Sequence, residues 1–295
     1  MKRLTVANPH GFCSGVARAV ATARKVLSDH QGEKVYCLHE IVHNGQVVSE
    51  LTAAGMVFVQ QVDDVPPGSV LLFSAHGVAP AVRKAAEARN LRVVDATCPF
   101  VAKVHATVRE FASKGVYVFC IGHHGHDEVV GVAGEAPDFV RVVEDENDVR
   151  SVSVPDGSGT AVVTQTTLSA EKVDRLIDAL RRRYPALRVP GGTEICYATR
   201  NRQRAVRRLA EVCGNVLVLG AANSSNSRRL VETAQSAGAN AALVSEMSDL
   251  DGSPLLDSEW LGITSGASTP ESFLDAVVNR LTRDYGFTGC DVLEC

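Results

Sequence analysis

Apolar and polar residues follow two periodicities along this chain. Short runs rich in Val, Ile and Leu predict buried strands, and they lie at residues 4–8, 34–42, 69–75, 91–96, 115–122, 160–166, 215–221, 241–246 and 261–265. Between several of them, apolar residues recur at helical spacing, most clearly over residues 15–27, 101–115 and 201–214. This alternation predicts an α/β fold with mostly parallel sheets covered by helices.

Three cysteines recur at equivalent junctions, at intervals of 85 and 98 residues: Cys13, Cys98 and Cys196. Each precedes a predicted helix that carries an early basic residue, which is Arg18, Lys103 or Arg200 in turn. Pro99 suits the first position of a helix, which places Cys98 at the cap. The recurrence predicts three pseudo-repeated α/β units, at residues 14–97, 98–195 and 196–285. We expect strand 1–13 to join the third unit, and we assign no element to the tail, residues 286–295.

Two polar loops follow each cysteine at similar offsets, and each loop comes directly after a predicted strand. The six loops contain, in chain order, His43, His76, His126, Thr166, Ser224 and Ser268. Side chains at the carboxyl ends of parallel strands lie at the edge of the sheet where α/β proteins bind ligands. The pattern therefore predicts three units that face one shared pocket, although chance repetition in a chain rich in βα turns is the alternative.

The composition is that of an ordinary globular protein, with 45% hydrophobic and 22% charged residues. A net charge of −4 argues against nucleic-acid binding, and no apolar run is long enough to cross a membrane. The N-terminus enters a strand directly, without a secretory apolar segment. We therefore expect a cytoplasmic protein whose eight cysteines are thiols or metal ligands rather than disulfides.

The run HEIVH, residues 39–43, matches the zinc-hydrolase pattern H-E-x-x-H. That chemistry requires a helix, because two histidines four apart then share one face. The surrounding residues are instead β-branched and aromatic, and Asn44-Gly45 follows, which predicts a strand ending in a turn. We therefore interpret His39 and Glu40 as strand residues, and His43 as a residue with another role.

Thiolates at helix N-termini are stabilised by the helix dipole, so three of them brought together form a site for a soft metal. Structural zinc would need a fourth protein ligand. A [4Fe–4S] cluster held by three cysteines would keep one iron open to substrate. Among the other cysteines, we expect Cys37, Cys120 and Cys213 in the core, and Cys290 and Cys295 as spare thiols of the tail.

The polar loops are rich in hydrogen-bonding groups and poor in cations. Their side chains are His43, His76, His126, Glu128, Thr166, Thr167, Ser224, Ser225, Asn226 and Ser268. Such a set suits a small polyanion such as a diphosphate, and no nucleotide-binding glycine loop is present. Glu128 is the natural proton donor, because burial beside an anion would raise its pKa.

Nine motifs carry a resemblance to a known family: GFCSGV, HEIVHN, FSAHGV, DATCP, GHHGHDEV, TQTTLS, ICYATRNRQ, NSSNS and SGAS. In this order they resemble 4-hydroxy-3-methylbut-2-enyl diphosphate reductase, the last enzyme of the non-mevalonate isoprenoid pathway. The likeness extends from residue 4 to about residue 285. It implies three α/β units around a central [4Fe–4S] cluster with one open iron, through which two electrons pass singly to the substrate and water is expelled.

The resemblance also implies roles for individual residues. Cys13, Cys98 and Cys196 would ligate the cluster, Glu128 would supply protons with His126 beside it, and Thr166 would orient the substrate hydroxyl. The diphosphate would be held by His43, His76, His126, Ser224, Ser225, Asn226 and Ser268. Ferredoxin or flavodoxin would deliver the electrons, and a basic face on the helix after Cys196 is the candidate dock. That face comprises Arg200, Arg202, Arg204, Arg207 and Arg208, with an ordinary solvated helix surface as the alternative.

Three positions depart from the family pattern. Asp127 replaces a proline and adds a charge beside Glu128, while His10 and His124 are histidines not expected there. Rival interpretations of the whole chain remain open: an iron–sulfur sensor or assembly factor, a zinc hydrolase, and a reductase of another allylic diphosphate. The sensor would not need Glu128 or Thr166, and the hydrolase would leave the three helix-capping cysteines unexplained.

Overall fold

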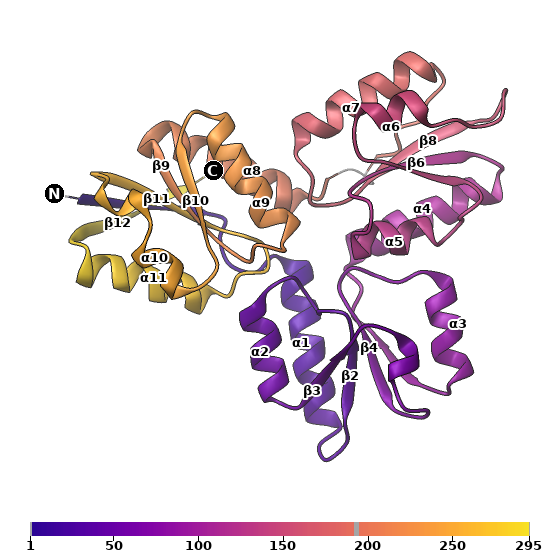
Figure 1. Ribbon diagram of the computed structural model, residues 1–295, viewed down its shortest axis with the longest axis horizontal. Coiled ribbons are helices and arrows are strands. Elements are labelled where there is room, and N and C mark those ends of the chain that lie inside the picture. Colours follow the sequence, from indigo (N-terminus) through magenta and orange to yellow (C-terminus); the bar gives the residue numbers. More distant parts are fainter. Residues whose placement is uncertain (1, 192–194, 295) are drawn as a thin grey trace. The chain divides into compact units, whose positions relative to one another are not determined.

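The computed structural model describes residues 2–191 and 195–294. Within them the chain forms three sheets, all of whose strand pairs are parallel (Figure 1). The prediction of an α/β fold with parallel, helix-covered sheets is therefore confirmed. No helix among the described residues combines the length and the apolar character that crossing a bilayer requires.

Contacts divide the chain into two compact lobes. The larger lobe contains Ala17–Val42 and Val48–Cys196, and the smaller lobe contains Met1–Val16, His43–Val47 and Tyr197–Cys295. Two of the sheets belong to the larger lobe and the third belongs to the smaller lobe. The boundaries of the three predicted units, at residues 98 and 196, stay predictions.

The first sheet has the strand order β3-β2-β4-β5. Its elements are α1 (Ser14–Asp29), β2 (Val35–Leu38), α2 (Gly45–Ala53), β3 (Met56–Val59), η1 (Val62–Asp64), β4 (Val70–Phe73), α3 (Pro80–Ala88) and β5 (Arg92–Asp95). On one face, Tyr36, Leu71 and Phe73 pack with residues of α3 and η1. Figure 1 shows α1 on the side of the sheet away from α3.

The second sheet has the order β7-β6-β8. Its elements are α4 (Pro99–Ser113), β6 (Tyr117–Ile121), α5 (Asp127–Ala133), β7 (Val140–Val143), α6 (Glu146–Ser151), β8 (Thr160–Thr164) and α7 (Ala170–Arg183). Along β6, Phe119 and Ile121 pack toward α7, whereas Val118 and Cys120 pack toward α4 and α5. Both faces are buried, which explains the unbroken apolar run of this strand.

The third sheet has the order β10-β9-β11-β1-β12. Its elements are β1 (Lys2–Asn8), α8 (Tyr197–Cys213), β9 (Asn215–Leu219), α9 (Ser225–Ser236), β10 (Asn240–Val244), α10 (Met247–Asp251), η2 (Pro254–Asp257), β11 (Trp260–Ser265), α11 (Glu271–Asp284) and β12 (Phe287–Glu294). In β9, Leu217 and Leu219 face the α11 core, and Val216 and Val218 face the α8 and α9 core. The side chains of β9 thus alternate between two apolar layers.

One expectation about a single element was wrong, and one segment without an assigned element is structured. β2 ends at Leu38, and His39 takes a left-handed φ of 58°, so His39 and Glu40 leave the sheet instead of continuing it. The tail is also structured, because Phe287–Glu294 form β12, which pairs with β1 along its whole length. β3 and β7 were missed as well.

Candidate functional site

The three recurring cysteines each come directly before a helix, as the sequence predicted. Cys13 precedes α1, Cys98 is the N-cap of α4 with Pro99 at its first position, and Cys196 precedes α8. Their thiols are half-buried. Cys13 Sγ accepts a hydrogen bond from the backbone N–H of Val16 at 3.4 Å, the contact that stabilises a thiolate at a helix start.

The other described cysteines differ in environment. Burial raises the pKa of both Cys37 and Cys120 to about 12, and the pKa of Cys213 to about 11. These thiols stay protonated in the core, as expected. Cys290 is exposed on β12, and Cys295 lies outside the described residues. The three helix-preceding cysteines are thus the ones suited to bind a soft metal.

Two of the early basic residues fix the segments that lead to the next cysteine. Arg18 donates from a guanidinium nitrogen to the carbonyl oxygen of Thr97, the neighbour of Cys98, at 2.8 Å. Lys103 donates from Nζ to the carbonyl oxygen of Gly191 at 3.3 Å, five residues before Cys196. The sequence shows that a basic residue recurs early in each of the three helices. The structure explains Arg18 and Lys103, because each binds the segment that leads to the next cysteine.

Glu128 is buried at the start of α5, with 2% of its surface exposed. Its Oε1 accepts the backbone N–H of Thr166 at 2.7 Å, and its Oε2 accepts the Thr166 hydroxyl at 3.0 Å. Burial raises the pKa of Glu128 to about 7, although both hydrogen bonds from Thr166 lower it. The carboxyl can therefore hold a proton near neutral pH and release it, which suits a general acid.

His126 is the N-cap of α5, and its Nδ1 accepts the backbone N–H of Glu128 at 3.2 Å. In the neutral ring the proton then resides on Nε2, which can donate to an anion. His76 stands edge-on to His126, with ring centroids 5.8 Å apart, and its Nδ1 lies 3.3 Å from the hydroxyl of Ser74. Three of the predicted loops of the larger lobe thus meet around Glu128.

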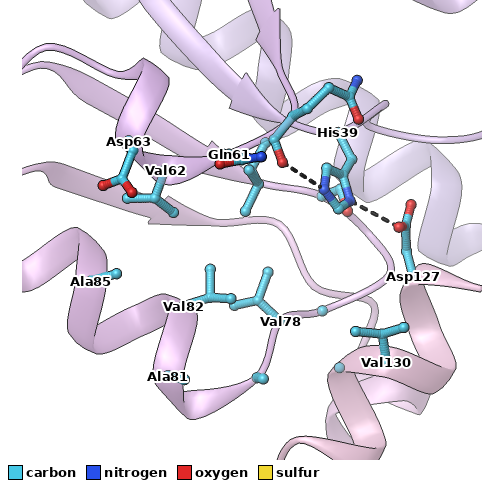
Figure 2. A pocket seen from close by; sticks show the side chains of 16 residues that line it. His39, Gln61, Val62, Asp63, Val78, Ala81, Val82, Ala85, Asp127 and Val130 are labelled. Atoms are coloured by element: carbon cyan, nitrogen blue, oxygen red, sulfur yellow. Dashed lines mark hydrogen bonds and ion pairs between the residues drawn. The ribbon is translucent and has the colours of Figure 1, made fainter. Parts of the chain in front are cut away.

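Asp127 points toward His39 (Figure 2). Its Oδ1 lies 2.9 Å from His39 Nδ1, and its Oδ2 lies 3.9 Å from His76 Nδ1. The pair borders a cavity of about 380 Å³, whose apolar wall in Figure 2 includes Val62, Val78 and Val82. Burial, and not the charge of Asp127, accounts for the raised pKa of Glu128.

In the smaller lobe, the predicted hydroxyl and amide residues gather at the N-terminus of α9. Ser224, its N-cap, accepts the backbone N–H of Ser227 at 3.3 Å, and Ser225 and Asn226 are buried in the first turn. Asn226 Oδ1 accepts the backbone N–H of Ala267 at 2.9 Å. Within the described part of the chain, Asn226 Nδ2 is buried without an acceptor, so this amide offers two donors to a ligand.

The same network reaches Cys13 and His43. The backbone N–H of Cys13 donates to the carbonyl oxygen of Ala267 at 3.0 Å. The Ser268 hydroxyl donates to the carbonyl oxygen of His43 at 3.0 Å. The short loop after β11 therefore contacts Asn226, Cys13 and the backbone of His43. Asn226 and His43 are predicted diphosphate ligands, and Cys13 is a predicted cluster ligand. That the residues of the two lobes serve a single substrate stays a prediction.

Two site residues were missed by sequence reasoning. Gln165 Oε1 accepts the backbone N–H of His123 at 3.0 Å, and its Nε2 donates to the Thr167 hydroxyl at 3.0 Å, so it joins the GHHGHDE and TQTT loops. Ser227 is fully buried, and a Cβ on Gly220 or Gly266 would lie 2.1–2.2 Å from its hydroxyl. Both residues belong to polar loops predicted from the sequence, TQTT and NSSNS, and this position was the signal that could have revealed them.

The predicted basic face on α8 requires a correction. Arg202 is buried, with 2% of its surface exposed, and donates to the carbonyl oxygen of Gly11 at 2.7 Å. It therefore supports the loop before Cys13 and cannot form part of a docking surface. Arg200, Arg204 and Arg208 are exposed and spaced four residues apart, so they follow one stripe of the helix.

His10 and His124, the two unexpected histidines, make local contacts. His10 Nδ1 lies 3.0 Å from the carbonyl oxygen of Ala7. His124 Nε2 lies 3.3 Å from Asp148 Oδ2. Neither contact involves a predicted ligand of the substrate or the cluster.

These features define an α/β protein with helix-capping thiols and a buried, proton-holding carboxyl group at the carboxyl ends of its parallel strands. Residues 4–282 match the family described as LytB protein. The chain belongs to this family.

Two relatives are similar over nearly the whole chain. The 4-hydroxy-3-methylbut-2-enyl diphosphate reductase of Mycolicibacterium paratuberculosis is 48% identical over 294 residues, which cover 99% of this chain and 87% of the relative. The enzyme named 4-hydroxy-3-methylbut-2-enyl diphosphate reductase 2 in Mycobacterium tuberculosis is 50% identical over 294 residues, covering 99% and 86%.

Two solved structures are similar as well. That of the E-1-hydroxy-2-methyl-but-2-enyl-4-diphosphate reductase from Plasmodium falciparum has a TM-score of 0.95 at 36% identity, covering 100% of this chain and 92% of that one. A structure of (E)-4-hydroxy-3-methyl-but-2-enyl diphosphate reductase, the terminal enzyme of the non-mevalonate pathway, has a TM-score of 0.67 at 30% identity, covering 96% and 99%.

Proposed function

We propose that this chain is a 4-hydroxy-3-methylbut-2-enyl diphosphate reductase of the non-mevalonate isoprenoid pathway. The observation that carries the proposal is the buried Glu128, held by Thr166 with its pKa raised to about 7, in a member of this family. The reaction breaks the bond between C4 and its hydroxyl oxygen. It consumes two electrons and two protons, and releases water with isopentenyl or dimethylallyl diphosphate.

Cys13, Cys98 and Cys196 fit the ligand set of a [4Fe–4S] cluster. All three are half-buried thiols at helix starts, where a thiolate is stabilised, whereas Cys37, Cys120 and Cys213 have raised pKa values. When bound, such a cluster supplies electrons singly and, with only three protein ligands, a Lewis-acidic iron. Proton transfer and diphosphate binding are carried out by side chains of the protein.

Proton transfer belongs to Glu128 and Thr166. The Thr166 hydroxyl donates to Glu128 Oε2, and a substrate hydroxyl that donates to Thr166 Oγ1 would complete a short relay. The protonated carboxyl gives its proton to the departing oxygen, so that water leaves instead of hydroxide. His126 fixes the start of α5 by accepting the Glu128 backbone N–H, which holds the carboxyl in place.

The diphosphate is bound by neutral donors and histidines. Asn226 Nδ2 is a buried donor at the N-terminus of a twelve-residue helix, where the dipole favours an anion. The Ser224 and Ser225 hydroxyls lie in the same turn, and His126 Nε2 and His76 are donors of the larger lobe. His43 and Ser268 belong to the same predicted set.

The electrons come from a ferredoxin or flavodoxin that docks on α8. The exposed stripe of Arg200, Arg204 and Arg208 lies on α8, which begins directly after Cys196, so an acidic carrier bound there would approach a cluster ligand. Opposite charges on the two surfaces would accelerate encounter more than they tighten the complex.

The test is anaerobic. Iron and acid-labile sulfide are quantified, EPR spectra of the reduced protein are recorded with and without the hydroxymethylbutenyl diphosphate, and products are identified by chromatography. Four irons per chain, a signal that changes with substrate and formation of both products support the proposal. A cluster that ignores this diphosphate would favour a sensor or a reductase of another allylic diphosphate. Zinc without sulfide would exclude the proposal.

A further inference from the structure

A second buried acid–histidine pair lies behind the loops around Glu128. His105 Nδ1, on α4, is 2.6 Å from Oε1 of Glu135, which follows α5, and their side chains are only 6% and 3% exposed. Arg109 donates to the same oxygen at 2.8 Å from a position 55% exposed. Although burial raises it, the hydrogen bonds from His105 and Arg109 hold the pKa of Glu135 below its usual value. Glu135 is therefore an anion, and His105 donates a hydrogen bond to it.

The His105 ring lies where three segments meet, and each of them carries a predicted site residue. α4 begins after Cys98, α5 carries Glu128, and the turn at Gly77 follows His76. A Cβ on Gly77 would lie 2.8 Å from His105 Nε2. One on Gly131 of α5 would lie 3.3 Å from both the Gly77 carbonyl oxygen and His105 Cε1. Glycine at both positions allows this close approach.

The pair is unfavourable in one respect. Within the described residues, His105 Nε2 and Glu135 Oε2 are buried and have no hydrogen-bond partner. Both residues line a cavity of about 180 Å³, large enough for a bridging water molecule. Well-packed apolar residues would commonly stabilise a fold as well as a buried ion pair, so stability alone is a weak reason for its presence.

We propose that His105 is a positioning residue that, through Glu135, holds α4, α5 and the His76–Gly77 turn as one rigid group. Glu128 and His76 then keep a fixed relation to the helix that begins after Cys98. The inference rests on the proposed function, because proton donation, diphosphate binding and cluster ligation are the roles it coordinates. Misplacement of about 1 Å at such a site is enough to cost a factor of about 100 in rate.

Kinetics of matched variants test the idea, with a small chemical reductant as electron source. H105N keeps a donor near the position of Nδ1, whereas H105Q moves the amide to the position of Nε2 and H105L has no donor. We expect kcat to fall about tenfold or more in H105L and H105Q and to recover to within about threefold in H105N. R109A removes the exposed donor to the same oxygen and should change kcat less than twofold. Equal kcat values in H105N and H105Q would overturn the proposal.

Hydrogen–deuterium exchange supplies a readout that does not depend on activity. The Thr166 backbone N–H donates to Glu128, so its protection reports the position of the carboxyl. Peptides spanning residues 126–131 and 164–168 should exchange faster in H105Q than in H105N or R109A. Uniform loss of protection across the chain would show that the pair only stabilises the fold, and unchanged protection would show that it holds neither loop in place; either result would overturn the proposal. Altered local exchange in a protein without reductase activity would refute the proposed function and leave the positioning role standing.

Discussion

The carboxylate of Asp127 accepts a hydrogen bond from His39 Nδ1 at 2.9 Å, while His39 Nε2 lies 3.1 Å from the carbonyl oxygen of Gln60. Neither partner carries a proton on the atom in contact, so both ring nitrogens donate and the geometry fits a protonated ring. The hydrogen bond to Asp127 raises the pKa of His39, although burial lowers it. The pair ties the residue after β2 to the first residue of α5, between His126 and Glu128.

The His39–Asp127 pair should make stability depend on pH. A raised histidine pKa stabilises the folded protein below the ordinary value of about 6.5, and the effect is lost as pH rises through the raised value. Because the side chains are 35% and 26% exposed, we expect less than about 1 kcal/mol. Urea unfolding should show wild type more stable than D127N at pH 6, with a smaller difference at pH 9. A difference independent of pH would contradict this assignment.

Activity should depend on the proton of Glu128. We expect E128Q to lower kcat by about 100-fold or more, because an amide cannot supply a proton. In the wild type, kcat should fall as pH rises through about 7. T166V removes the hydroxyl that lowers the pKa of Glu128, so the descending limb should move to higher pH, while T166S should leave it in place. Superimposable profiles for T166V and T166S would refute the coupling.

The same carboxyl predicts a second pH effect, on stability. Buried Glu128 keeps its proton up to about pH 7, whereas in the unfolded chain it ionises near 4.5. The folded state therefore binds more protons in this range, and its stability falls as pH rises. The loss amounts to about 3 kcal/mol by linkage. E128Q should not show this loss of stability. The free energy of unfolding of wild type minus that of E128Q should therefore decline between pH 4.5 and 7 and then level off. A parallel pair of curves would show that Glu128 titrates normally.

Much of the fold could be predicted because buried parallel strands are apolar on both faces. The runs around β4, β6, β9 and β11 therefore stood out, and Pro99 marked the start of α4 correctly. β12 could not be found in this way, because its side chains are mostly exposed and it exists through pairing with β1 at the other end of the chain. The end of β2 depends on the left-handed backbone of His39, which no apolar pattern reveals.

The sequence predicted which loops form the candidate site, but not which side chains within them contact one another. Residues directly after strands had to lie at a sheet edge, which brought Glu128 and Thr166 into consideration together. Which side chains face inward depends on packing between elements. That is why Gln165 was missed and why Arg202, which resembles its exposed neighbours in sequence, was wrongly assigned to the surface.

Loss of single thiols should separate the three proposed ligands from the rest. C13S, C98S and C196S should each retain less than half of the iron bound by wild type, because an alcohol is a poor ligand for a soft metal. C290S, whose thiol is exposed on β12, should bind as much iron as wild type. Iron and sulfide assays on anaerobically purified protein give the answer. Full iron content in any of the three serine variants would remove that residue from the ligand set.

The arginine stripe of α8 should matter only for a protein electron donor. Reversing charge in R204E/R208E should slow turnover with reduced ferredoxin or flavodoxin about tenfold at low salt, since steering depends on charge complementarity. Turnover with a small chemical reductant should be unchanged. R181E/R182E, on exposed arginines of α7, carries the same charge change elsewhere and is the control. Equal slowing with both kinds of donor, or equal slowing in the control, would rule out docking on α8.

Asn226 should contribute to substrate binding through the donor side of its amide. Its Oδ1 accepts the backbone N–H of Ala267, while its buried Nδ2 meets no acceptor among the described residues. N226D keeps an acceptor for Ala267 but replaces the donors with a negative charge facing a diphosphate, so KM should rise by about 100-fold or more. N226A loses both functions without adding charge, and its KM should rise less, by about tenfold, with some loss of stability. Initial rates over a range of substrate concentrations, with unfolding curves for each variant, separate the two effects. If N226D bound substrate as well as N226A, the amide would serve only to hold the Ala267 loop.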